Sequence, residues 1–283
     1  MRHAALALVL LAASCGGAAV TTSTDSATTR PIPTTSTTTV PVAIGCPQDT
    51  EFVGSGRIGR ITQPASDSKT LGLISRTVVD GCEKFGFDFE TVENAPATTP
   101  PSVDAEFLSG ERVVRIHVDI DQTVITDQLV ETALVERIFV VRSLGGSMFI
   151  DLHLAGPANA RISVSNSPAR LGLELTPRDG EIGPQASFSD AVVLISPVAD
   201  STVGQEFTVT GYGRTFEATV LILATREEEV LAQQAVTAAD WVETWGEFTA
   251  EVAATPGQAN LFVGEESPRD GSLSGITLRL LVQ

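Results

Sequence analysis

The residues best suited to chemistry in this sequence are two histidines with carboxylates close to each. His117 and Asp119 alternate with apolar residues in one segment, and Asp151 and His153 do so in another. Alternation with a period of two places such side chains on one face of a strand. If the two strands were neighbours, His117, Asp119 and His153 could converge on a metal ion. The simpler interpretation makes all four residues the solvent-exposed faces of two amphipathic strands.

Other patterns that indicate catalysis are missing from the sequence. It contains no Gly-x-Ser-x-Gly elbow and no Ser-x-x-Lys of β-lactamase type. The glycines at 54–56 and 145–146 lack the strand–loop–helix context of a phosphate-binding loop. The acidic run Glu227–Glu229 is typical of a solvated loop. We therefore expect a protein that is not an enzyme and that has no cofactor.

The charge balance excludes one large class of partner. The 283 residues carry a formal net charge of −17, with 18 basic against 35 acidic residues. Such a surface repels phosphate backbones, so nucleic-acid binding is disfavoured. The hydrophobic fraction of 42% is normal for a globular protein that buries a core.

The N-terminus carries a short apolar segment that ends at a cysteine. Behind Arg2, the segment closes on the residues Leu11-Ala12-Ala13-Ser14-Cys15. Its length of roughly 10 residues is far below the roughly 20 needed to cross a bilayer as a helix, and suits a signal peptide. The pattern resembles a bacterial lipoprotein signal, which implies a signal peptide over residues 1–14 and a lipid (palmitate) on Cys15. An ordinary secretory signal cut elsewhere is the alternative.

Residues 15–44 are rich in Thr, Ser and Pro. They contain too little apolar surface to offset the entropy of ordering, so we predict a disordered tether. Together with a lipid on Cys15, this tether would display the folded part on the extracytoplasmic face of the cell membrane.

Two cysteines remain once Cys15 is assigned to lipid. Outside the cytoplasm an even pair usually oxidises, so Cys46 and Cys82 are predicted to form a disulfide. Two free buried thiols or a metal pair are the alternatives.

From Gly45 onward the sequence is typical of a mainly β protein. Apolar and polar residues alternate around Phe85, Phe87 and Phe89, and again in later segments. Thr126–Val141 is the one segment predicted to hold a short helix before its strand. The polar, glycine-bearing segment 178–190 is taken as the boundary between a first β domain, 45–180, and a second one, 190–283.

The second domain is predicted to be a seven-stranded sandwich of immunoglobulin size. The predicted strands are Val192–Ser196, Glu206–Gly213, Ala218–Ala224, Val230–Val236, Glu247–Val252, Ala259–Glu265 and Ile276–Val282.

This second domain resembles a known family. The motifs that carry the resemblance are Val209-Thr210-Gly211-Tyr212-Gly213, Phe216, Trp245-Gly246-Glu247-Phe248 and Pro268-Arg269-Asp270-Gly271-Ser272. The last of these motifs is predicted to form a turn, with its glycine at a permissive position. They are similar to the Gmad2 family, the immunoglobulin-like domain of bacterial spore germination proteins. The resemblance implies a non-catalytic domain that mediates interactions at the cell envelope. Gly211, Phe216, Trp245 and Phe248 are expected to form its core, and the buried indole needs a partner for its N–H.

The first domain resembles the AMIN-like domain of actinobacterial envelope proteins. The matching residues are Asp80-Gly81-Cys82-Glu83-Lys84-Phe85, Arg137–Arg142 and Ser167-Pro168-Ala169-Arg170-Leu171. The resemblance implies a β-sandwich linked to cell-wall targeting.

Taken together, the sequence predicts a lipid-anchored, non-catalytic binding or scaffold protein of the envelope. Its partner would be a cell-wall polymer or an envelope protein. Two alternatives stay open: a structural component linked to sporulation or germination, and an extracytoplasmic metal-dependent hydrolase.

Overall fold

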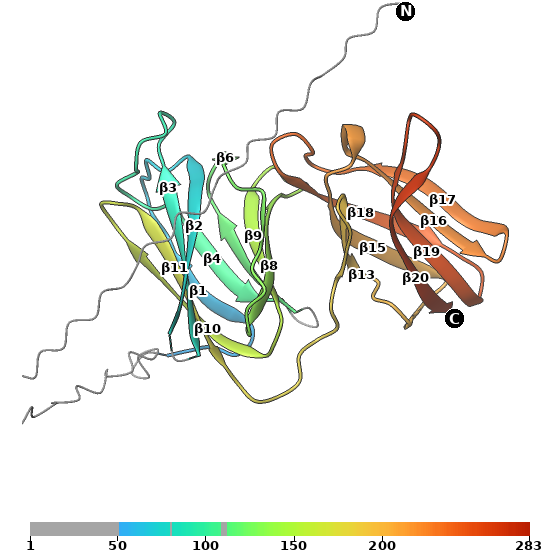
Figure 1. The fold of residues 1–283 in the computed structure, drawn as a ribbon, viewed down its shortest axis with the longest axis horizontal. Helices are drawn as coiled ribbons and strands as arrows, with labels where there is room; N and C mark the ends of the chain where they lie inside the picture. Colours follow the sequence, from blue (N-terminus) through green and yellow to red (C-terminus); the bar gives the residue numbers. More distant parts are fainter. Residues whose placement is uncertain (1–50, 80, 109–111) are drawn as a thin grey trace, which may run out of the picture. The chain divides into compact units, whose positions relative to one another are not determined.

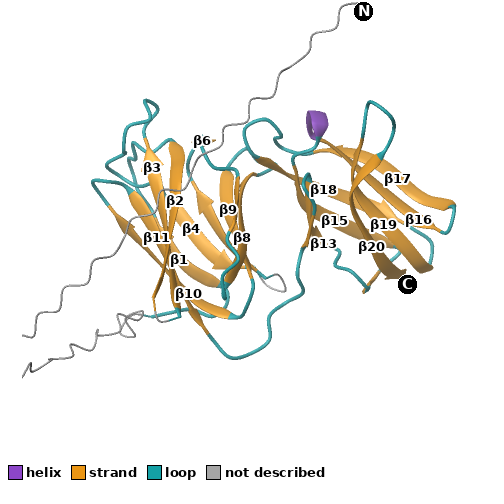
Figure 2. Ribbon diagram, in the orientation of Figure 1, coloured by secondary structure: helices purple, strands orange, loops and turns teal. Residues whose placement is uncertain are grey.

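The structure is a computed structural model that describes residues 51–79, 81–108 and 112–283. These residues form a mainly β protein (Figure 1; Figure 2). The signal peptide, Cys15, the tether and Cys46 lie outside the described residues. The short 3₁₀ turn η1 (Phe216–Ala218) is the helical element of the described ranges and is drawn in purple in Figure 2.

The first half of the described chain is a sandwich of two sheets. One sheet has the strand order β10-β11-β3-β2-β6. Its strands are β10 (Ala158–Ser165), β11 (Arg170–Pro177), β3 (Cys82–Glu90), β2 (Thr70–Val79) and β6 (Gln122–Thr123). The facing strands have the order β1-β4-β5-β9-β8, with β7 paired to β8. They are β1 (Arg57–Ile61), β4 (Val103–Phe107), β5 (Val113–Val118), β9 (Met148–Leu154), β8 (Val135–Arg142) and β7 (Asp127–Leu129).

The second half is another sandwich. One layer has the order β18-β15-β13-β12, and the other has the order β14-β20-β19-β16-β17. The first layer contains β18 (Trp245–Ala253), β15 (Glu206–Gly213), β13 (Val192–Ser196) and β12 (Ser187–Phe188). The second contains β14 (Ser201–Val203), β20 (Leu273–Val282), β19 (Gly257–Glu266), β16 (Thr219–Arg226) and β17 (Glu229–Thr237). All seven predicted strands are present, while the short strands β12 and β14 were not predicted.

One sheet runs through both sandwiches. The C-terminal end of β8 pairs in parallel with the start of β18, through Val141 with Trp245 and Arg142 with Gly246. The result is a ten-stranded sheet that includes β7. The irregular residues 178–186, which lie within the predicted boundary 178–190, connect β11 to β12.

Each sandwich has its own apolar core. Alternate residues of β3, including Phe85, Phe87 and Phe89, are at most 2% exposed and face the first core, as the period-two pattern predicted. Phe248 and Leu261 belong to the second core and are fully buried.

The predicted helix within Thr126–Val141 is wrong. The segment holds β7 and β8, which pair with each other from Asp127 with Phe139 to Leu129 with Arg137. The later part, Val-Glu-Arg-Ile-Phe-Val-Val-Arg, is rich in β-branched and aromatic residues, which favour strands. Its pairing with β9 then fixes the extended conformation.

Gly211 is required by close packing in the second sandwich. A Cβ atom at this position would lie 2.1 Å from the backbone oxygen of Val193 and 3.0 Å from the ring of Phe248. We expect Gly211→Ala to lower the free energy of unfolding by about 3 kcal/mol, since overpacking forces the backbone of β13 and β15 apart. Urea unfolding measures this effect. Gly145→Ala is the matched control, because its Cβ would meet only Ser143 Oγ at 3.7 Å. Equal stability of the two variants would contradict the packing argument.

Candidate functional site

A group of aromatic and titratable side chains lies where the two sandwiches meet. We call this contact the sandwich junction. Its buried apolar residues are Phe139, Val141, Phe149, Val193, Ile195, Tyr212 and Trp245, with Ala186 and Phe188 packed against them. Strand β9 has this cluster on one face and the first core on the other, so all seven of its residues are buried.

A hydrogen-bonded network crosses the junction through Asp151 of β9. This carboxylate is 0% exposed and accepts two hydrogen bonds from Arg115 of β5, at 2.9 Å from Nε and 2.7 Å from Nη2. The hydroxyl of Tyr212, on β15 of the second sandwich, donates to the same carboxylate at 2.9 Å. Two-point pairing of arginine with a carboxylate is among the strong interactions of proteins. Asp151 therefore joins a cation of one sandwich to a hydroxyl of the other.

His153 extends this network. Its Nε2 lies 2.6 Å from the Tyr212 hydroxyl oxygen. Because that hydroxyl gives its single hydrogen to Asp151, it must accept from the imidazole, so Nε2 carries the hydrogen. The rings of Phe139, Phe188 and Tyr212 pack around the imidazole at centroid distances of 5.4, 5.1 and 6.1 Å.

The surroundings set the charge of both basic groups. Burial lowers the pKa of His153 from 6.5 to about 4; Asp151 opposes this change, while Arg115 and Arg137 add to it. The imidazole is therefore neutral at pH 7, in agreement with its hydrogen bond to Tyr212. Burial alone would lower the pKa of Arg115, but the charge and hydrogen bonds of Asp151 reverse this and raise it.

The structure does not bring His117, Asp119 and His153 together. In the β5–β9 pairing His117 lies opposite Phe149, whereas His153 lies opposite Val113. Four residues along a strand correspond to roughly 13 Å, far more than two ligands of one metal ion allow. Within the described ranges, no group of three His, Cys, Asp or Glu residues could hold a metal ion.

The expectation that Asp151 and His153 face solvent is also wrong. Both are buried, at 0% and 2% exposed, because the second sandwich covers their face of β9. Asp119, in contrast, is exposed, and His117 is half-buried with its ring against Phe149.

The four residues expected to form the core of the second domain lie in three different environments. Gly211 and Phe248 are in that core, in mutual contact. Trp245 is 4% exposed but belongs to the sandwich junction, where its indole N–H donates to Asp127 of the first sandwich at 3.3 Å. Phe216 is 53% exposed, so its assignment to the core is wrong. It sits in the short turn η1 between β15 and β16.

Cys82 begins β3, is 2% exposed and is disulfide-bonded. The predicted partner, Cys46, lies outside the described residues, so the Cys46–Cys82 pairing stays a prediction.

The rim of the junction holds a loop of the second sandwich, residues 238–244. Arg142 of β8 donates to Asp240 and to Glu243, both at 3.0 Å. Asp240 Oδ1 also accepts the next three backbone N–H groups of the loop, at 2.6, 2.9 and 3.2 Å. The loop lies directly on β18, because a Cβ atom on Gly246 would be 2.2 Å from the backbone nitrogen of Asp240. A residue of the first sandwich thus helps to shape this loop.

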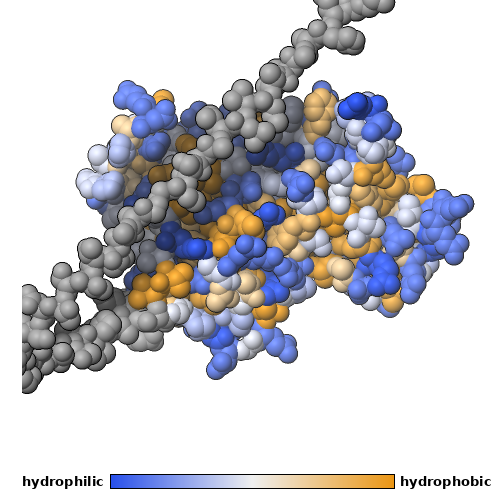
Figure 3. Space-filling view, viewed as in Figure 1, coloured by the Kyte–Doolittle hydropathy of each residue, from blue (hydrophilic) through white to orange (hydrophobic). Residues whose placement is uncertain are grey.

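In this loop and beside it, large apolar side chains remain in contact with solvent. Phe216 and Trp241 are 53% and 36% exposed, and their rings meet edge to face at 5.7 Å between centroids. Val242 is 65% exposed. We call these three residues the aromatic platform. On the face drawn in Figure 3, patches of hydrophobic residues lie among hydrophilic ones.

An open depression of about 600 Å³ adjoins Phe216. Its floor includes Leu221 and Ala235, and its opposite wall is the turn between β19 and β20. This turn is the one predicted for Pro268–Ser272, with Gly271 at a φ of 72°. The charged residues that line the depression are Glu217, Glu265, Glu266, Arg269 and Asp270.

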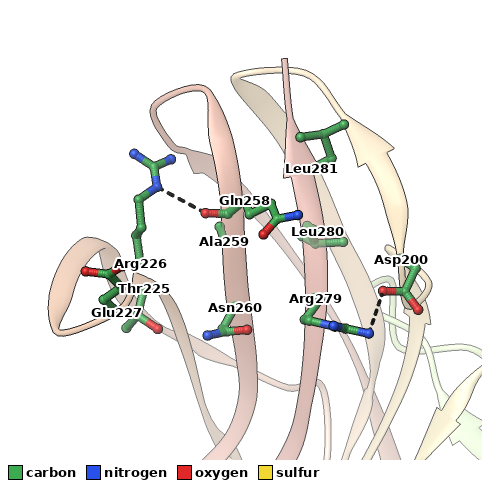
Figure 4. A pocket seen from close by; sticks show the side chains of 10 residues that line it. All are labelled: Asp200, Thr225, Arg226, Glu227, Gln258, Ala259, Asn260, Arg279, Leu280 and Leu281. Carbon is green, nitrogen blue, oxygen red and sulfur yellow. Dashed lines mark hydrogen bonds and ion pairs between the residues drawn. The ribbon is translucent and has the colours of Figure 1, made fainter.

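A second depression, of about 650 Å³, lies at the other end of the β16 and β19 strands (Figure 4). Arg226 donates there to the backbone oxygens of Thr255, Pro256 and Gln258, and so braces the turn before β19. Arg279 pairs with Asp200 at 3.4 Å, and both side chains are more than two-thirds exposed. Exposed ion pairs of this kind contribute little to stability. We therefore interpret the charged residues of this depression as local braces of the strand ends.

Sequence reasoning missed Arg115, Tyr212 and Trp241. Arg115 lies two residues before His117, on the same face of the strand. The assumption that the two strands are neighbours would therefore also have placed Arg115 near Asp151. Tyr212 is the single tyrosine of the chain, but nothing local indicates that its hydroxyl crosses to another sandwich. Trp241 stands in a loop that periodicity does not describe.

Among the described residues no helix is long and apolar enough to span a membrane. The comparisons with curated proteins and with solved structures gave no match. A comparison with family models gave one for the second sandwich. Residues 191–272 match Gmad2, described as the immunoglobulin-like domain of bacterial spore germination, so this part of the chain is a Gmad2 domain.

Proposed function

We propose that this chain is a lipid-anchored, non-catalytic scaffold of the cell envelope. In this proposal Cys15 carries the lipid, residues 15–44 are the tether, and a disulfide links Cys46 to Cys82. The first sandwich is assigned to the AMIN-like domains. The folded part would contact a cell-wall polymer or an envelope protein.

One observation carries the non-catalytic part of the proposal. Asp151 and His153, the pair that most resembled catalytic or metal-binding groups in the sequence, are occupied by Arg115 and Tyr212 inside the sandwich junction. Their hydrogen bonds to Tyr212 connect the two sandwiches. The Gmad2 match supplies an immunoglobulin-like domain, and the description of that family names bacterial spore germination.

The anchor is tested by labelling the full chain in its host with radioactive palmitate. We expect label on the parent chain and on Cys46→Ala, and none on Cys15→Ala, because Cys46→Ala removes a thiol but leaves the lipid site. Labelled protein should sediment with the membranes, because a cysteine that carries more than one acyl chain anchors a protein stably. An unlabelled parent chain that stays in the soluble fraction would overturn the anchor.

The binding part has its own test. The full chain in detergent is incubated with purified cell wall and, separately, cross-linked in membrane extract. Retention by the wall supports a polymer partner, and a defined cross-linked product supports a protein partner. Failure of both would overturn the scaffold proposal.

A link to sporulation or germination is the second candidate, and the description of the matching family favours it. In a spore-forming host, deletion of the gene should lower spore yield or slow germination. Unchanged spore yield and germination would remove this candidate and leave the scaffold proposal in place.

A further inference from the structure

The aromatic platform is an exposed apolar surface with a fixed shape. Exposed apolar groups that cluster, rather than occur singly, mark interaction sites. Phe216 and Trp241 come from two different loops and still meet edge to face. Such a pair exposes two ring systems to a partner at once.

Both loops are held in place by hydrogen bonds, and the Phe216 loop also has an unusual backbone conformation. Glu217 and Ala218 have φ angles of 54° and 57°, a left-handed conformation that non-glycine residues seldom adopt. The backbone N–H of Phe216 donates to Glu265 at 2.8 Å. Asp240 fixes the Trp241 loop in the same way and is itself bound by Arg142. Backbone strain that the surroundings maintain is characteristic of binding sites.

The charges around the platform have one dominant sign. The adjoining depression is lined by Glu217, Glu265, Glu266 and Asp270 against a single cation, Arg269. Glu243, on the Trp241 loop, is 57% exposed and pairs with Arg142. Aromatic faces attract cations, and carboxylates beside them add to that attraction.

We propose that the aromatic platform and the adjoining depression bind a segment of a partner protein that carries lysine or arginine side chains. The basic groups would lie against Phe216 and Trp241, with Glu217 and Glu266 as counter-charges. The aliphatic stems of these long side chains would cover Leu221 and Ala235 on the floor of the depression. This inference names the partner class of the proposed scaffold, but the binding itself does not depend on the lipid anchor.

The test measures binding of fluorescently labelled ten-residue peptides to the full chain in detergent, by fluorescence anisotropy. A lysine-rich peptide should bind, and raising the salt concentration should weaken it. A glutamate-rich peptide of the same length should not bind. Failure of the lysine-rich peptide, or equal binding of the glutamate-rich one, would overturn the inference. The palmitate and cell-wall experiments would stand regardless, so the two failures are distinguishable.

Variants locate the binding to this surface. Phe216→Ala should weaken it about tenfold, as is typical of an anchoring aromatic residue. Glu217→Gln should weaken it about threefold, within the range of a single exposed charge pair. Glu227→Gln is the matched control, because it removes the same charge from the β16–β17 turn at the other end of the domain. Equal effects of Glu217→Gln and Glu227→Gln, or tighter binding of soluble cell-wall glycan than of the peptide, would contradict the assignment.

Discussion

Replacing Asp151 with alanine is expected to lower the free energy of unfolding by about 3–5 kcal/mol. The substitution leaves Arg115, whose side chain is 17% exposed, without the carboxylate that neutralises it. It also removes the acceptor of the Tyr212 hydroxyl. A buried cation that loses its partner costs far more than an exposed one, because water cannot replace the lost interaction. Equilibrium unfolding in urea, followed by tryptophan fluorescence, gives the measurement.

Two further variants make this result specific. Asp119→Ala removes an exposed carboxylate near the end of β5 and should change stability by less than about 0.5 kcal/mol. The double variant Arg115→Met/Asp151→Leu should recover much of the loss, because apolar residues can replace a buried ion pair at little cost. If Asp151→Ala and Asp119→Ala are equally stable, the network does not hold the sandwich junction together.

Acidification from pH 6.5 to pH 4 is expected to destabilise the protein by about 3 kcal/mol through His153 alone. In the unfolded chain this histidine takes up a proton around 6.5, whereas in the folded protein burial lowers its pKa to about 4. Between these values the unfolded state binds more protons, so acid favours unfolding. Well above pH 6.5 the histidine is neutral in both states, and its full contribution is present. Urea unfolding at pH 7, 5.5 and 4.5 measures the slope.

His153→Gln should flatten this pH dependence, because glutamine does not titrate. His117→Gln removes a histidine outside the network and should leave a steeper dependence than His153→Gln does. Asp240 does not affect this measurement. Burial alone would raise the pKa of Asp240, but hydrogen bonds from Arg142 and from its own loop outweigh burial and lower this pKa below 3.8. Its contribution to stability is therefore lost only below the pH range of the measurement. An identical slope for His153→Gln and the parent chain would contradict the assignment.

The strands of this protein could be predicted because period-two alternation is a local property. The pattern around Phe85, Phe87 and Phe89 places β3 correctly, since its apolar face packs on one core and its other face is more exposed. Turn residues were equally informative. Gly271 adopts the positive φ that the turn between β19 and β20 requires.

The same pattern gave a wrong prediction of exposure where a second layer covers the polar face of a strand. Asp151 and His153 alternate with apolar residues just as solvent-exposed residues do, yet both lie inside the sandwich junction. Their polarity reflects partners far along the chain: Arg115 is 36 residues away and Tyr212 is 61 residues away. No short window of sequence contains such pairs. The assignment of Phe216 to the core was wrong for the opposite reason. A large aromatic residue predicts burial, but this one lies in a turn and is 53% exposed.

The pairing of β8 with β18 has a consequence for any attempt to separate the two sandwiches. One edge of β8 is shared between β7, near Arg137–Phe139, and β18, at Val141 and Arg142. A fragment that contains only the Gmad2 domain would expose an unpaired end of β18 together with Tyr212 and Trp245. Unpaired strand ends beside apolar surface are templates for aggregation. Self-association of such a fragment would therefore result from the unpaired end of β18, and would not indicate a natural dimer.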